Sequence, residues 1–252
     1  MKIIDQSPFR AEDGSSSLEN RLRGIWKHGL SWDRDRKAED SFIAHLQKGL
    51  DNKYTMVRSA TLPDLEVPIP LVLAGPPGIY VIVASALKGI YKAKEEVWAV
   101  MDANSRRFKP ARPNLVKRAL LMAKAIENYL SEEFQDLPEV SPVLFLAQPG
   151  IHVDAENPAV RLVRVDAADR YVLGLAQSPF ALDPTEVKRI SDALTRPLPE
   201  KEQAGVSILD DTSMATIGSI SLQRRQWLLI GLMGIIEIFL LVAFAIVILT
   251  LS

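Results

Sequence analysis

A run of basic residues without acidic neighbours is the feature of this sequence most readily linked to chemistry. Between Ala103 and Ala125 there are seven lysines and arginines and no aspartate or glutamate, and Phe108 lies among them. These basic residues are Arg106, Arg107, Lys109, Arg112, Lys117, Arg118 and Lys124. Such a cluster can hold the phosphates of lipid head groups or of nucleic acid. A solvated helix face is the simplest interpretation, and contact with lipid or with a protein partner is the next. Nucleic acid is the least favoured, because a formal net charge of −1 gives no whole-molecule attraction to it.

The residue types for most other kinds of site are missing or scattered. The chain has no cysteine, which excludes disulfides, Cys-ligated zinc and thiol catalysis and suits a reducing cytosol. His28, His45 and His152 have no metal-ligand spacing. The segment 75–78, Gly-Pro-Pro-Gly, lacks the Gly-Lys-Ser/Thr ending of a phosphate loop, and its prolines remove backbone donors. We therefore expect no resident metal and no cofactor.

The most apolar segment predicts a membrane anchor. Residues 227–251 contain a single charged side chain, that of Glu237. As a helix they would be about 37 Å long, and a bilayer's hydrocarbon core is about 30 Å thick. Arg224 and Arg225 precede the segment and Trp227 opens it, as interface anchors do. The positive-inside tendency then predicts a tail-anchored, single-pass protein in the membrane, with its N-terminal domain in the cytoplasm.

Glu237 lies near the middle of this predicted span. A carboxylate at that depth is costly, by about 2.5–3.5 kcal/mol on insertion scales for the related Asp. Two interpretations remain open: a polar contact with a helix of another membrane protein, or a protonated side chain tolerated in a very apolar helix. Gly231 and Gly234 are three residues apart, so no small-xxx-small motif is present. The expected partners are thus the lipid bilayer and a second membrane protein.

Composition and periodicity divide the chain into four parts. Residues 1–32 predict a disordered tail over 1–14 and a short basic amphipathic helix, which either packs on the main domain or lies on an anionic membrane. Residues 33–195 predict the main domain, and 223–252 the membrane helix. Residues 196–222 are rich in Pro, Gly, Ser and Thr and predict a flexible linker that reaches roughly 30 Å.

The main domain is predicted to be α/β, with a mixed sheet flanked by helices. Helices are expected at 33–51, at 113–134 and from Asp183-Pro184 onward. Strands are expected at 54–59, 69–74, 79–85, 90–93, 97–101, 143–147, 162–165 and 172–173. The strand at 79–85 is continuously apolar, which is typical of a central strand buried on both faces.

Short motifs lie in a fixed order between Ala38 and Leu130. They are Ala38-Glu39, Ile69-Pro70, Gly75-Pro76-Pro77-Gly78, Val83-Ala84-Ser85, Lys88-Gly89, Trp98 and a proline at 110 or 113. In this order they resemble the NERD (nuclease-related domain) family, whose pattern has Gly-Glu, Ile-Asp, Gly-Pro-x-Gly, Glu-x-Lys, a Gly turn, Trp and Asn-Pro. No glutamine follows the proline at the family's spacing. The resemblance implies a restriction-endonuclease-like fold.

The residues that would carry the family's chemistry are replaced. Members use an Asp and a Glu to hold a divalent metal, which activates water, and a Lys near that water. The matching positions here are Pro70, Val83 and Ser85. Magnesium requires oxygen ligands, and the side chains of Pro70 and Val83 have none. The resemblance therefore implies a nuclease-like fold without its catalysis, a pseudoenzyme.

Two functions follow from these patterns. The first is a membrane-anchored, non-catalytic NERD-like domain that serves as a binding, scaffold or assembly subunit at the cytoplasmic membrane face. The alternative is a membrane-bound, metal-dependent nuclease with a rearranged site built from Glu39, Asp64 and Glu66. Convergence of two of these three carboxylates would favour the alternative.

Overall fold

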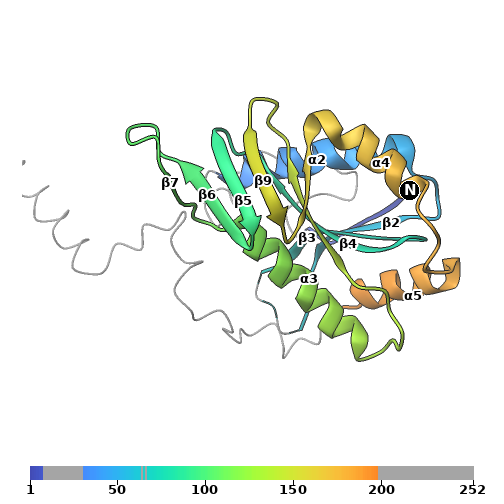
Figure 1. The fold of residues 1–252 in the computed structure, drawn as a ribbon. Helices are drawn as coiled ribbons and strands as arrows, with labels where there is room; N and C mark the ends of the chain where they lie inside the picture. The colour runs from blue at the N-terminus through green and yellow to red at the C-terminus, as the bar shows by residue number, and fades with distance from the viewer. Residues whose placement is uncertain (8–30, 64, 66, 198–252) are drawn as a thin grey trace, which may run out of the picture. The chain divides into compact units, whose positions relative to one another are not determined.

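The computed structural model of this chain describes residues 1–7, 31–63, 65 and 67–197 (Figure 1). The chain divides into two compact units, Met1–Ile217 and Gly218–Ser252, and all the described residues belong to the first. Within these described ranges no helix is long and apolar enough to cross a membrane. The predicted span 227–251, with Glu237 and Trp227, lies outside the described residues. So do Arg224 and Arg225, the predicted amphipathic helix near the N-terminus and all but the first two residues of the predicted linker.

The larger of the two described sheets is mixed and has six strands, in the order β1-β2-β3-β4-β8-β10. They are β1 (Lys2–Asp5), β2 (Thr55–Ala60), β3 (Ile69–Gly75), β4 (Gly78–Ser85), β8 (Ser141–Leu146) and β10 (Arg161–Arg164). Only β3 runs antiparallel to its neighbours in this sheet. The other five strands point the same way, so their carboxyl ends meet at one edge of the sheet, here called the carboxyl edge.

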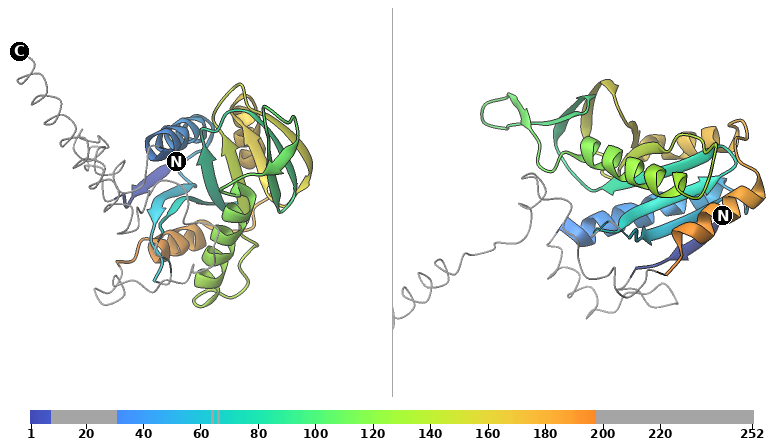
Figure 2. Two further views of the ribbon diagram at one scale, coloured as in Figure 1. Left: turned by 90° about the vertical axis from the view of Figure 1, so that its left-hand side faces the viewer. Right: turned by 90° about the horizontal axis from the view of Figure 1, so that it is seen from below.

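Helices cover both faces of this sheet, as Figures 1 and 2 show. On one face lie α2 (Ser31–Gly49) and α4 (Ala168–Ala176), which follows a short 3₁₀ turn, η1 (Val165–Ala167). On the other face lie α3 (Leu115–Ser131) and α5 (Pro184–Leu194). Because the two faces are covered, β3 and β4 are buried along almost their whole length. The predicted α/β class with helices flanking a mixed sheet is confirmed, as is the central position of β4.

A second mixed sheet continues two strands of the first. It has the order β7-β6-β5-β9, with β5 (Ile90–Glu95), β6 (Val97–Met101), β7 (Phe108–Pro110) and β9 (His152–Pro158). Strand β4 leads into β5 and β8 leads into β9, and both pairs are parallel. The inner face of this sheet packs into the same core as α3, with Tyr91 stacked on Trp98 at 4.8 Å between ring centroids. The β6–β7 hairpin extends away from the core (Figure 1).

The sequence accounts for where two of the helices begin. The side chain of Asn114 accepts a hydrogen bond from Lys117 N and caps α3. Helix α5 begins at Asp183-Pro184, as predicted, and Asp183 and Glu186 form a capping box there. The apolar stripe of α3 is buried throughout: Leu115, Ala119, Met122, Ile126 and Leu130.

Four segments differ from the predictions. Disorder over residues 1–14 is wrong for Lys2–Asp5, because β1 pairs in parallel with β2. The strand predicted at 172–173 is wrong as well, since both residues lie in α4. There, Ala168, Val172 and Leu175 are buried at helical spacing. Strands β7 and β9 were not predicted, and both carry mostly exposed side chains.

Candidate functional site

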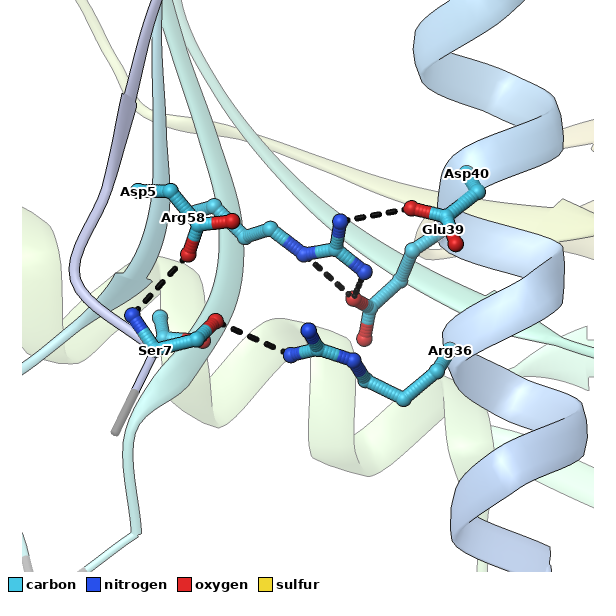
Figure 3. Close-up of polar contacts among 7 residues, drawn as sticks. Asp5, Ser7, Arg36, Glu39, Asp40 and Arg58 are labelled. Atoms are coloured by element: carbon cyan, nitrogen blue, oxygen red, sulfur yellow. Dashed lines mark hydrogen bonds and ion pairs between the residues drawn. The ribbon is translucent and has the colours of Figure 1, made fainter. Parts of the chain in front are cut away.

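A buried arginine–carboxylate pair stands at the carboxyl edge (Figure 3). The side chain of Arg58, on β2, is 1% exposed. Its Nε and Nη2 atoms both donate to Oε2 of Glu39, on α2, at 3.1 and 2.7 Å. Its Nη1 donates to Oδ1 of Asp40 at 2.6 Å. All three bonds join charged groups, which makes them stronger than bonds between neutral groups.

The positions of these residues follow from the periodicities of their elements. Along β2, Met56 and Arg58 face α2, while Val57 faces α3 and α5. On α2, Glu39 lies next to Ala38 and three residues before Phe42, on the helix face that packs on the sheet. An arginine and a glutamate at inward positions therefore meet inside the layer between α2 and β2.

Hydroxyl groups extend the cluster toward the segment that follows β1. The Oγ atoms of Ser7 and Ser59 are 2.9 Å apart, and Nη1 of Arg36 donates to Ser7 Oγ at 2.9 Å. Ser7 N donates to Oδ1 of Asp5 at 2.9 Å. Ser59 has a φ of +56°, in the left-handed region that L residues rarely adopt. The end of β1 is thereby joined to both β2 and α2 (Figure 3).

A second partly buried carboxylate, that of Asp35, lies one helical turn earlier on α2. Oδ1 of Asp35 accepts a hydrogen bond from Ala86 N, just beyond β4, at 3.3 Å. Burial raises the pKa of Asp35, and the charge of Arg118, on α3, opposes that rise. Burial also lowers the pKa of Arg118, opposed by the charges of Asp35 and Glu39. Within the described residues, the buried Nε of Arg118 has no hydrogen-bond partner.

Burial dominates the electrostatics of Glu39. It raises the pKa of Glu39 to about 6, although the charges of Arg58 and Arg36 work in the opposite direction. For Arg58, burial acts to lower the pKa, but Glu39 and Asp40 outweigh it and the pKa is raised. At neutral pH the carboxylate is therefore ionised and bound to the guanidinium.

This arrangement does not suit the binding of a metal ion. Two hydrogen bonds from Arg58 already occupy one oxygen of Glu39. Three guanidinium groups, those of Arg36, Arg58 and Arg118, interact electrostatically with one or both of the carboxylates of Asp35 and Glu39. Their positive charge opposes a divalent cation. Arginine also remains protonated in proteins, so it offers no general base. In the part of the chain that the structure describes, no group of three His, Asp or Glu residues could hold a metal ion.

Asp64 and Glu66 lie outside the described residues. Whether Glu39 groups with them therefore stays a prediction.

The positions that resemble the family's catalytic residues also lie at the carboxyl edge, but on the other face of the sheet. Leu71 pairs with Ile82, so the next residues along the two strands, Pro70 and Val83, are neighbours. Val83 is 2% exposed and belongs to the core on the α3 side. Ser85, two residues on, is buried, and its carbonyl accepts from Ala147 N. Glu39 faces the α2 side, so the sheet separates it from Val83 and Ser85.

The structure places the residues of the predicted basic patch in three different surroundings. Arg106 and Arg107 are exposed in the turn of the β6–β7 hairpin, and Lys109 pairs with Asp102 at its base. Arg112 and Lys117 are exposed near the start of α3. Arg118 differs, since it is partly buried and interacts with the acidic residues of α2.

Arg58 was not predicted as a site residue. The signal in the sequence was an arginine inside the strand 55–60, whose neighbours are apolar or small. A charged residue at a buried strand position requires a partner of opposite charge, and the acid on the apolar face of α2 is that partner.

Comparisons with protein-family models, with curated proteins and with solved structures find no match to this chain. The likeness to the NERD family therefore rests on the motifs in the sequence.

Proposed function

We propose that this chain is a membrane-anchored, non-catalytic domain of NERD-like, restriction-endonuclease-like fold. It serves as a binding, scaffold or assembly subunit at the cytoplasmic face of the membrane. The observation that carries the proposal is the pairing of Glu39 with Arg58, in which the buried carboxylate of this edge is bound by a guanidinium.

The argument rests on what a metal-dependent nuclease must keep available. Such an enzyme needs carboxylate oxygens that can bind a hydrated cation beside the attacking water. Here Glu39 is held by Arg58, and Asp35 is bonded to Ala86 N beside Arg118. Pro70 and Val83 provide no oxygen ligand in their side chains. These features support a domain that holds its shape at this edge and acts by binding.

The nuclease-like part of the proposal is supported by the order of motifs along the described fold. Glu39 on α2, the tight turn Pro76-Pro77 between β3 and β4, and Trp98 on β6 occur in the order of the NERD pattern. The mixed sheet flanked by helices is compatible with that fold.

A nuclease assay tests the absence of catalysis. Full-length protein in mild detergent is incubated with labelled DNA and RNA in the presence of Mg²⁺ or Mn²⁺. We expect no cleavage above that of the double variant Asp64→Asn/Glu66→Gln, which controls for contaminating nucleases. Cleavage that requires the metal and is lost in this variant would support the alternative, a membrane-bound nuclease with a rearranged site.

The anchoring part of the proposal concerns Glu237 in the predicted span. Proteins bound to the wild-type chain in mild detergent are compared with those bound to Glu237→Leu. Loss of a membrane-protein partner in the variant is expected if the carboxylate contacts another helix. An identical set of partners would show that Glu237 makes no such contact.

A further inference from the structure

We propose that the tip of the β6–β7 hairpin, residues 102–109, binds the phosphate groups of an anionic membrane surface. The inference rests on the proposed function and deepens it, since it gives the tethered domain a second contact with the bilayer. The hairpin extends away from the core in Figure 1 and in the right-hand view of Figure 2.

The turn at the hairpin tip is built by Asp102. Its Oδ1 accepts from Asn104 N at 2.8 Å and from Ser105 N at 3.1 Å. Its backbone N donates to Arg107 O at 2.9 Å, and its carbonyl accepts from Arg106 N at 2.8 Å. Arg106 has a φ of +51° within this closed turn. The turn therefore has a defined backbone that presents Arg106 and Arg107 to solvent.

The positive charge of the tip is not neutralised within the described part of the chain. The carboxylate of Asp102 pairs with Lys109, and a hydrogen bond from Lys109 is the main cause that lowers the pKa of Asp102 to about 2. Among the described residues, Arg106 and Arg107 have no acidic partner. On β5 and β9, by contrast, the lysines have acidic partners, because Lys92 and Lys94 pair with Glu156.

An exposed aromatic side chain accompanies these arginines. Phe108 is 39% exposed and follows Arg107 directly in the chain. It pairs with Met101 at the end of β6, next to the turn. Arginines beside an exposed aromatic residue on a protruding hairpin suit the head-group region of a bilayer. Single-stranded nucleic acid instead favours a basic groove with several aromatic platforms.

The experiment uses the absence of native cysteine, which allows a single label. Ser105→Cys in the full-length chain carries a polarity-sensitive fluorophore, and the protein is reconstituted in nanodiscs of phosphatidylcholine alone or with phosphatidylserine. We expect a blue shift only in the anionic discs, reversed by high salt. A second label, at Glu132→Cys at the far end of α3, should show no shift.

Two variants carry the test further. Arg106→Gln/Arg107→Gln should abolish the shift. The matched control Arg170→Gln/Lys188→Gln removes the same charge from exposed positions on α4 and α5 and should keep it. An unchanged shift in the first variant, or an equal shift in both lipid compositions, would overturn the proposal. So would a wild-type shift produced by RNA or DNA but by neither disc.

A separate arm distinguishes this inference from the proposed anchor. If the labelled chain does not insert into nanodiscs, the proposed membrane anchor is disproved. In that case the labelled chain is added to preformed vesicles of the same two lipid compositions. There we expect association with anionic vesicles that the double substitution weakens roughly 10- to 30-fold, because each basic residue near such a surface strengthens binding about fivefold. Equal binding by both chains would disprove the role of the hairpin alone.

Discussion

The carboxyl edge and the β6–β7 hairpin both present arginines, and they use them in opposite ways. At the carboxyl edge, Arg58 is buried and three of its nitrogens donate to carboxylates. On the hairpin, Arg106 and Arg107 are exposed and have no acidic partner among the described residues. The two regions carry a similar number of positive charges and differ in how far those charges are exposed to solvent.

The difference shows what each group can do. A buried ion pair is held by the cost of leaving either charge alone in a medium that solvates it poorly. It joins the elements that provide it and is not available to a ligand. Exposed arginines contribute little to stability and remain free to meet an external anion. The first region therefore maintains the fold, and the second is the better candidate for contact with a partner.

The largest expected effect comes from Arg58→Met. This substitution leaves the carboxylate of Glu39 buried without its partner, which typically costs about 3–5 kcal/mol of unfolding free energy. Arg106→Met, at an exposed position, should change stability by no more than about 0.5 kcal/mol. Urea unfolding of the full-length chain in detergent, followed by tryptophan fluorescence, compares the two.

A double variant identifies the cause of that loss. Arg58→Met/Glu39→Leu removes both charges and should recover much of the stability lost in Arg58→Met. If the double variant loses as much unfolding free energy as the two single variants together, the pairing of Arg58 with Glu39 is not the source of the effect.

The next effect in size is a dependence on pH that belongs to Glu39. Burial raises its pKa from 4.5 to about 6, so the folded protein binds this proton more tightly than the unfolded chain does. The resulting stabilisation is complete below pH 4.5 and is lost as the pH rises through 6, a change of about 2 kcal/mol. We therefore expect the difference in unfolding free energy between wild type and Glu39→Gln to fall by this amount between pH 4.5 and 7. A difference that stays constant with pH would contradict the raised pKa.

The smallest expected effect is local and concerns the hairpin. Asp102→Asn removes the charge that pairs with Lys109 and weakens the bonds to the amides of Asn104 and Ser105. Amide hydrogen exchange at these two residues should become faster, while exchange on β3 and β4 stays unchanged. Exchange measured by mass spectrometry or NMR reports this change. Unaltered rates at the tip would mean that Asp102 does not order the turn.

The central layer of the fold could be predicted because its side chains are apolar on a regular period. Strands β3 and β4 are buried on both faces, and the stripe of α3 repeats every three to four residues. Strands β1, β7 and β9 have mostly exposed side chains, so they carry no such pattern, and pairing with distant strands decides their structure. Val172 and Leu173 resembled a strand locally, whereas the buried positions at 168, 172 and 175 decide for the helix α4.

The candidate site was only partly visible in the sequence. Glu39 was found through its place in the family motif, and the exposure of Arg106 and Arg107 agrees with a solvated basic cluster. Arg58 was missed because nothing in a single sequence states which distant residue faces it. Arg118 follows Lys117 directly in the chain. Adjacent residues of a helix point in different directions, so Lys117 is exposed while Arg118 is partly buried and interacts with Asp35.

The parallel pairing of β1 with β2 has a consequence for the order of folding. When β1 joins a sheet on which α2 is already packed, it closes the segment of about 25 residues between β1 and α2, at an entropic cost of about 3 kcal/mol. Four residues with mostly exposed side chains offset that cost only partly. We therefore expect β1 to join last during folding and to detach first. The hydrogen bonds of Ser7 with Ser59 and Arg36 then determine how long the strand stays in place.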